Sequence, residues 1–120
     1  MIIDKSLLDN LSTQAKASPR LRMHYDLRDS DHDSSQRMLN ALEPGTIMNI
    51  HQHADTSETV FVIRGAIVEH FYDDNYQLTE SYVIKAGSDT MGLSVPIGQL
   101  HNLECLEEGT VIVSVKNGKF

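Results

Sequence analysis

The sequence predicts an all-β fold, a jelly-roll barrel (double-stranded β-helix) preceded by a short N-terminal helix. About eight short strand-like segments follow one another, with glycine and proline residues between them. Apolar residues at helical spacing precede these segments, near the N-terminus. Potential metal ligands occur in two places far apart in the chain, and a barrel of this kind would bring them together.

Residues 4–18 are expected to form the helix. Ser6 and Asp9 match a capping box at its start, and Pro19 closes the segment. The apolar side chains at helical spacing are Leu7, Leu8, Leu11 and Ala15. We expect this stripe to pack on the barrel or on a partner subunit rather than to take part in chemistry.

Residues 19–35, between the helix and the barrel, are expected to form a linker and an exposed loop. Arg20 and Arg22 bring positive charge into the linker, and His32 in the loop is expected at the surface. One interpretation is that both arginines are solvated. The other is that an arginine folds over the barrel mouth and binds an anionic group, because a guanidinium suits bidentate recognition of phosphate or carboxylate.

The barrel is expected to begin with a strand at residues 36–42, on which Asn40 faces either the cavity or the solvent. A turn at residues 43–45 follows. The further strand-like segments are 47–53, 58–65, 66–72, 78–85, 91–95, 102–107 and 111–115. Within these strands, His70 is expected to be structural or at the surface, and Cys105 is expected in the core.

The segment from Gly45 to Gly65, GTIMNIHQHADTSETVFVIRG, carries the clearest chemical signal. His51 and His53 are two residues apart, so on a strand both imidazoles point to one face. Glu58 follows at the start of the next strand. Neutral imidazole and carboxylate are ligands of borderline divalent metals, so the segment predicts a metal site; solvated surface histidines are the alternative interpretation.

A third histidine, His101, ends the segment PIGQLH after a turn built on Pro96 and Gly98. In a jelly roll it would lie beside the other three groups. Three imidazoles and one carboxylate leave open positions on the metal, which is typical of catalytic sites. We expect one divalent transition metal ion, and the ligand types do not choose among Fe, Mn, Ni, Co and Zn.

The segment from Gly45 to Gly65 resembles the first cupin motif: a glycine, five residues, HxH, four residues, a glutamate, six residues and a glycine. Residues 96–101 resemble the later half of the second cupin motif, PxGxxH. Closer still, QRMLNALEPGT before HxH, SPRLR upstream and VKNG near the end are similar to the WbuC family of small cupin metalloproteins. This resemblance implies a homodimer and a role in surface polysaccharide (O-antigen-type) biosynthesis. It also favours an arginine at the barrel mouth.

Composition and charge narrow the classes of function. The 120 residues are expected to form a single cupin domain, with residues 1–33 as helical arm and linker and residues 34–120 as the barrel. The net charge of −7 disfavours nucleic-acid binding, because a phosphate backbone would be repelled. The single cysteine allows no intramolecular disulfide. No apolar run approaches the roughly 20 residues of a membrane span, and no secretory signal is recognised, so we expect a cytoplasmic protein.

Three functions fit these observations. The first is a metal-dependent isomerase or epimerase of a sugar or sugar nucleotide, in which a cavity side chain moves a proton. The second is a ferrous dioxygenase of a small organic substrate. The third is a non-catalytic module that binds a small anion. The candidate substrate contacts are Arg20, Arg22 and Asn40, and the candidate proton-transfer groups are Tyr25, Tyr72, Tyr82 and His70.

Overall fold

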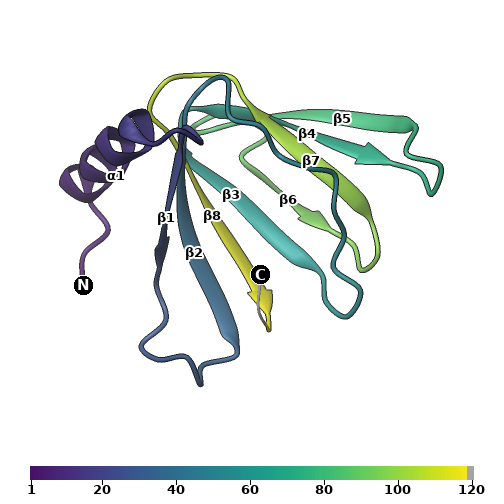
Figure 1. Ribbon diagram of the computed structural model, residues 1–120, viewed down its shortest axis with the longest axis horizontal. Coiled ribbons are helices and arrows are strands. Elements are labelled where there is room, and N and C mark those ends of the chain that lie inside the picture. The colour runs from purple at the N-terminus through teal and green to yellow at the C-terminus, as the bar shows by residue number, and fades with distance from the viewer. Residues whose placement is uncertain (119–120) are drawn as a thin grey trace.

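A computed structural model describes residues 1–118, and over this range it contains one α-helix and eight β-strands in two antiparallel sheets (Figure 1). The elements are α1 (Lys5–Ala17), β1 (Arg22–Asp26), β2 (Ser35–Leu42), β3 (Glu58–Arg64), β4 (Ala66–Tyr72), β5 (Leu78–Lys85), β6 (Gly92–Val95), β7 (Leu100–Cys105) and β8 (Thr110–Asn117). The predicted all-β jelly-roll fold with a short N-terminal helix is therefore confirmed.

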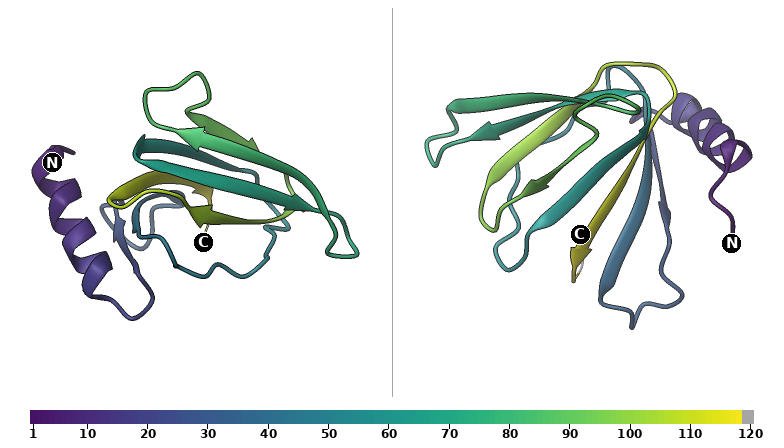
Figure 2. Two further views of the ribbon diagram at one scale, coloured as in Figure 1. Left: turned by 90° about the horizontal axis from the view of Figure 1, so that it is seen from above. Right: turned by 180° about the vertical axis from the view of Figure 1, so that it is seen from behind.

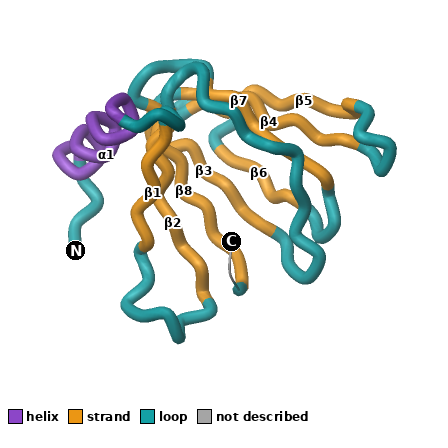
Figure 3. The backbone as a smooth tube through the Cα atoms, viewed as in Figure 1, coloured by secondary structure: helices purple, strands orange, loops and turns teal. Residues whose placement is uncertain are grey.

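The large sheet has the strand order β1-β2-β8-β3-β6, and the small sheet has the order β5-β4-β7. The two sheets approach each other near the top of Figure 1 and diverge below, where the long loop between β2 and β3 runs between them (teal in Figure 3). Both sheets contribute to the buried core, which consists of Leu42, Val60, Val62, Ile67, Ile84, Leu103, Cys105 and Ile112. The expected place of Cys105 in the core is confirmed.

The helix begins directly after Asp4, whose carboxylate accepts a hydrogen bond of 2.9 Å from the Leu7 backbone N–H. Asp4 is the N-cap, so the capping box expected at Ser6 and Asp9 is wrong. An aspartate caps a helix as well as a serine does, and Asp4 comes first in the chain. Asp9 lies within the helix instead and forms an ion pair of 2.6 Å with Arg64.

The apolar side of α1 packs on the outer face of the large sheet (Figure 2). The buried residues of this contact are Leu11, Ala15, Leu39, Ala41 and Val111. Arg64, at the end of β3, adds polar contacts: it donates to the Ser12 hydroxyl at 2.9 Å and to the Gly109 carbonyl at 2.8 Å. The stripe thus packs on the barrel of its own chain. With 13 residues and a polar outer side, α1 falls short of a membrane span, and it is the one helix in the described range.

Residues 22–26, which the sequence analysis assigns to a linker, form strand β1. This strand pairs with β2 over its whole length, from Arg22 opposite Leu42 to Asp26 opposite Met38. Its five residues mix charged and apolar side chains without a clear period of two. Hydrogen bonding to β2, rather than a local pattern, therefore makes this segment a strand.

Residues 47–53 do not form the regular strand that the sequence predicts. Along this segment one residue pairs in the manner of a sheet: His51 and His101 exchange backbone N–H to carbonyl bonds of 3.0 and 2.9 Å. Ile47 is exposed, and the His51 side chain bonds to the Asn49 carbonyl. Local side-chain bonds and the lack of burial compete with a ladder here. Because β1 takes the place of this segment, the chain still reaches eight strands in the described range.

Gly65, at the turn between β3 and β4, is expected to tolerate no side chain. Its φ is +83°, and a Cβ there would lie 2.8 Å from the Thr110 Cα and closer still to its Oγ1. Gly65→Ala should therefore lower the free energy of unfolding by about 1–2 kcal/mol for the left-handed backbone and a further 1–3 kcal/mol, roughly, for the clash. Urea unfolding measures this loss.

Gly87→Ala is the matched control for this substitution. Gly87 has a φ of +71°, but nothing lies within 4 Å of a Cβ built there. Gly87→Ala should therefore lower the free energy of unfolding only by the cost of the left-handed backbone. Equal losses of stability in the two variants would contradict the steric explanation.

Candidate metal centre and its cavity

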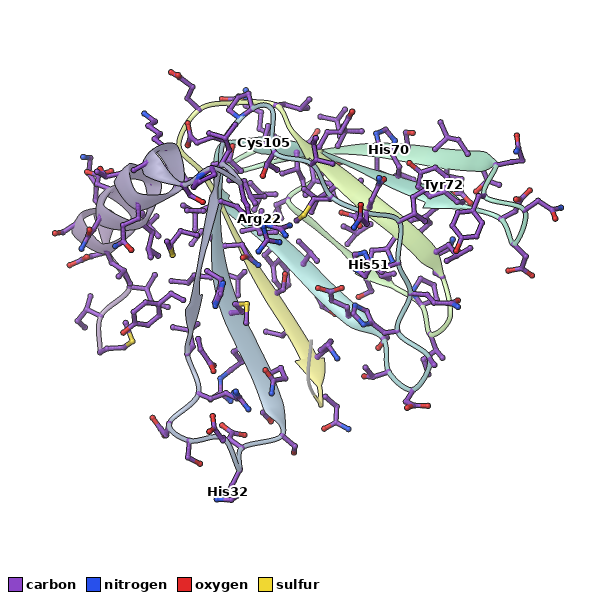
Figure 4. The ribbon with its side chains drawn as sticks, in the orientation of Figure 1. Arg22, His32, His51, His70, Tyr72 and Cys105 are labelled. Atoms are coloured by element: carbon purple, nitrogen blue, oxygen red, sulfur yellow. The ribbon has the colours of Figure 1, made fainter. Side chains whose placement is uncertain are left out.

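A cavity of about 620 Å³ opens between the two sheets. This volume is in the range of small-molecule binding sites. Figure 4 shows Arg22 and His51 in the space between the sheets, whereas His32 lies far away at the tip of the loop before β2. His32 is exposed there, as expected.

Four side chains converge on the wall of this cavity: His51, His53, Glu58 and His101. One potential ligand atom from each lies within 4.8 Å of the others. The first two belong to the long loop after β2, Glu58 is the first residue of β3, and His101 lies in β7 of the other sheet. Glu58 and His101 are buried, while His51 is exposed. The fold thus brings the four predicted ligands together, and the set could hold a metal ion.

Backbone carbonyls orient two of the imidazoles. Nδ1 of His51 lies 3.0 Å from the Asn49 carbonyl oxygen, and Nδ1 of His101 lies 2.7 Å from the Gln99 carbonyl oxygen. A carbonyl can only accept, so Nδ1 is the donor in both rings. In the neutral ring the lone pair then belongs to Nε2. This is the arrangement in which an outer hydrogen bond fixes the tautomer of a metal-binding histidine.

The polar atoms inside the cluster are poorly satisfied without an ion. Nε2 of His53 lies 3.1 Å from Glu58 Oε1, but Nε2 of His101 lies 3.5 Å from the same oxygen. Within residues 1–118, His101 Nε2 is buried and has no hydrogen-bond partner. An unpaired buried nitrogen costs stability, and a divalent cation at this point would satisfy it. The donor set therefore fits a transition metal ion.

The cluster perturbs the pKa values of its members. Burial would raise the pKa of Glu58, but its contacts with His101 and His53 outweigh burial and lower it. Burial lowers the pKa of His53, and the charge of Glu58 only partly offsets this. Burial would also lower the pKa of His101, yet Glu58, the Gln99 carbonyl and Glu69 together raise it. Glu58 is thus held as a carboxylate, the form that binds a cation.

The three candidate substrate contacts, Arg20, Arg22 and Asn40, all lie on the cavity wall. Arg22 reaches it from the first position of β1 and is half-buried, whereas Arg20 lies in the turn before that strand and is exposed. Asn40 on β2 faces the cavity. Arg37, an odd number of residues away on the same strand, instead forms an ion pair of 3.0 Å with Asp33.

One residue of the cavity wall, Glu69 on β4, is not among the predicted site residues. Only 1% of Glu69 is exposed, and its Oε2 has no hydrogen-bond partner in the described part of the chain. Burial raises its pKa to about 8, although His101 opposes the rise and Glu58 adds to it. The signal lies in the strand AIVEHFY, where Glu69 shares its side with the apolar Ile67 and Phe71. A carboxyl on the apolar side of a strand is the pattern that could have found it.

The candidates named for proton transfer lie elsewhere. None of Tyr25, Tyr72, Tyr82 and His70 belongs to the described wall of the cavity. His70 bonds to the Ser81 hydroxyl at 2.7 Å and to Glu104 at 3.1 Å, which agrees with its expected structural or surface role. Figure 4 shows His70 and Tyr72 on the small sheet, away from His51.

A family model described as a domain of unknown function (DUF6016) matches residues 3–84 of the chain. The matched range includes His51, His53 and Glu58 and ends before His101. No curated protein matches the sequence.

Solved cupin structures are similar to the chain, at a level of identity that shows the fold alone. KdgF from a Halomonas species has a TM-score of 0.67 at 14% identity, over 86% of this chain and 84% of KdgF. The capsular polysaccharide assembling protein CapF from Staphylococcus aureus has a TM-score of 0.70 at 24% identity, over 86% of this chain and 29% of CapF. An oxalate oxidase in complex with glycolate has a TM-score of 0.67 at 17% identity, over 85% of this chain and 53% of the oxidase. The chain has the cupin fold, while the closer resemblance to the WbuC family stays a prediction.

In the metal-free protein, Glu69 is expected to make stability fall as the pH rises. Its pKa is about 8 in the folded state, against a usual value of 4.5. Between these values the folded protein keeps a proton that the unfolded chain has released, so raising the pH through this window costs stability. Glu69→Gln has no such proton to lose. Its urea midpoint should therefore depend less on pH in this range than that of the wild type.

Glu43→Gln is the control for this pH dependence. Glu43 is also buried, but its Oε2 accepts a hydrogen bond of 2.8 Å from the Gly109 N–H. Its substitution should lower stability by about 1–3 kcal/mol, which measures the loss of a buried carboxylate's hydrogen bond apart from Glu69. Identical slopes for the wild type and Glu69→Gln would show that Glu69 titrates normally.

Proposed function

Because the chain belongs to the DUF6016 family, whose description assigns no function, we propose a function from the cavity itself: the protein is a metal-dependent cupin enzyme that acts on a small sugar-type or anionic molecule. The observation that carries this proposal is the convergence of three imidazoles and one carboxylate on the wall of a 620 Å³ cavity. A purely structural metal site is closed, whereas this one faces space for a second molecule.

The residues that would hold the metal are His51, His53, Glu58 and His101. When bound, a divalent ion of Fe, Mn, Ni, Co or Zn would supply a Lewis acid that polarises a hydroxyl or carbonyl oxygen. The protein's own part is to keep Nε2 of His51 and His101 free for it, through their bonds to backbone carbonyls. Glu58 contributes the negative charge that compensates the cation.

We propose a sugar or sugar nucleotide of surface polysaccharide biosynthesis as the substrate class. Arg20 and Arg22 on the cavity wall suit a phosphate or carboxylate, and Asn40 can donate to or accept from a hydroxyl. The fold similarity to CapF, a capsular polysaccharide assembling protein, and the resemblance to the WbuC family support this class. The reaction would be an isomerisation or epimerisation.

A ferrous dioxygenase is the second candidate, and a non-catalytic module that binds a small anion is the third. Open positions beside a set of histidines and a carboxylate permit O₂ chemistry, and the fold is shared with an oxalate oxidase. Oxygen uptake by the iron-loaded protein would favour the second. Stabilisation by ligand with neither turnover nor oxygen uptake would favour the third.

His51→Ala and His101→Ala are each expected to lose bound metal. Removing one of the four ligands leaves three donor side chains, which hold a divalent ion less tightly. Metal content measured by mass spectrometry on protein purified without an affinity tag tests this. His70→Ala is the control, because His70 bonds to Ser81 and Glu104 outside the cavity. Full metal content in either cluster variant would refute the ligand assignment.

Arg22→Ala is expected to weaken the binding of anionic molecules without releasing the metal. A thermal-shift screen of the metal-loaded protein with UDP-glucose, dTDP-glucose, pyruvate and 2-oxoglutarate measures the effect, since ligand binding raises the melting temperature. Arg37→Ala should leave the shifts intact, because Arg37 is paired with Asp33 and lies outside this cavity. Shifts that survive in Arg22→Ala would remove Arg22 from the binding site.

A further inference from the structure

Glu69 is a buried carboxyl, and one of its two oxygens has no hydrogen-bond partner among the residues that the structure describes. Its exposed fraction is 1%, and no described residue bonds to its Oε2. Buried polar atoms in folded proteins nearly always have a hydrogen-bond partner, so this exception needs a cause. Glu69 lines the cavity, and the remaining source of a partner is therefore whatever occupies that cavity.

The position of Glu69 relative to the metal cluster is distinctive. Its strand, β4, pairs with β7, and Phe71 lies opposite His101 while Glu69 lies opposite Leu103. Glu69 thus shares a wall of the cavity with His101, and its charge influences that ring. It is not one of the four residues whose ligand atoms lie within 4.8 Å of one another. It is a neighbour of the cluster rather than a member.

Glu43 shows what a structural carboxyl looks like in this chain. It is similarly buried, with 4% exposed, but it accepts the Gly109 N–H at 2.8 Å and lies outside the cavity. That bond joins the turn after β2 to the turn before β8. Glu69 makes no equivalent bond within residues 1–118 through its Oε2, so packing alone does not account for a charged side chain there.

We propose that Glu69 contacts the molecule bound in the cavity and exchanges a proton with it. This inference rests on the proposed function, because it assumes a substrate beside the metal cluster. For a hydroxy-carbonyl compound, a Glu69 carboxylate oxygen takes the proton from the carbon next to the carbonyl. The C–H electron pair forms a carbon–carbon double bond, and the carbonyl pair moves onto oxygen. The proton of the neighbouring hydroxyl passes to that oxygen, and the hydroxyl oxygen becomes the new carbonyl oxygen. Return of the proton from Glu69 to the former carbonyl carbon completes an isomerisation without any oxidant.

Glycidol, a three-carbon epoxide, tests whether a bound molecule can reach the carboxyl. In the Zn²⁺-loaded wild type, a Glu69 oxygen should attack the terminal epoxide carbon, the C–O bond should open and its oxygen should take a proton. Peptide mass spectrometry should find one glycidol unit as an ester on Glu69. The Glu43→Gln variant should keep this label, and Glu69→Gln should lose it. Because the wild type gives the main result, it does not depend on how well a variant folds.

Hydrogen–deuterium exchange of dihydroxyacetone in D₂O, followed by proton NMR, tests the proton transfer. The Zn²⁺-loaded wild type should accelerate exchange, and Glu69→Gln should lose about 10²-fold or more of that rate, the typical contribution of a general base. Zinc content and circular dichroism of both proteins show that the comparison is between folded, metal-loaded forms.

Absence of an ester on Glu69, or equal exchange rates in the wild type and Glu69→Gln, would overturn the assignment of Glu69. Either result with full zinc content would leave the metal site standing. A wild type that binds no Zn²⁺, Fe²⁺, Mn²⁺, Co²⁺ or Ni²⁺ would instead overturn the proposed function, and this inference with it. Metal content therefore separates the two failures.

Discussion

The reciprocal backbone pairing of His51 with His101 is the interaction on which the site depends. It ties the loop after β2, which leaves the large sheet, to β7 of the small sheet by hydrogen bonds of 3.0 and 2.9 Å. The loop has no regular strand to hold it, so this bridge fixes where His53 and the approach to Glu58 lie, together with a bond of 2.9 Å from the Gly98 N–H to the His53 carbonyl. Potential ligand atoms from residues up to 50 positions apart in the sequence thereby lie close together between the two sheets.

The four converging side chains could be predicted from the sequence because their spacing is dictated locally. The HxH pair, the glutamate at a strand start and the histidine after PxG each follow from a short local pattern. The barrel fold then brings these separate segments together. The errors arose where distant contacts decide the outcome. Residues 22–26 become a strand because β2 offers hydrogen bonds, and residues 47–53 stay irregular because one bridge and side-chain bonds satisfy them. The bounds of the helix agree with the prediction to within one residue, but its cap was placed at Ser6 instead of Asp4, since both residues are good caps.

Glu69 was missed for a different reason. Its strand is recognised by its apolar residues, and Glu69 interrupts the apolar side formed by Ile67 and Phe71. The sequence does not show what the carboxyl of Glu69 faces. Such a residue costs folding free energy, because its ionisation must be suppressed in the interior. Residues that lower stability in this way concentrate where binding or chemistry takes place. The position of the cavity explains why a carboxyl occurs on this apolar side of β4.

Strand β1 lies at the edge of the large sheet and bonds to β2 on one side only. Arg22 enters the cavity from this strand and Arg20 from the residues just before it, whereas the histidines and Glu58 belong to β3, β7 and the loop that bridges the two sheets. Under the proposed function, recognition of the bound molecule and retention of an ion would therefore fall to separate stretches of polypeptide. Substitutions confined to the edge strand would then alter specificity while the inorganic centre keeps its composition.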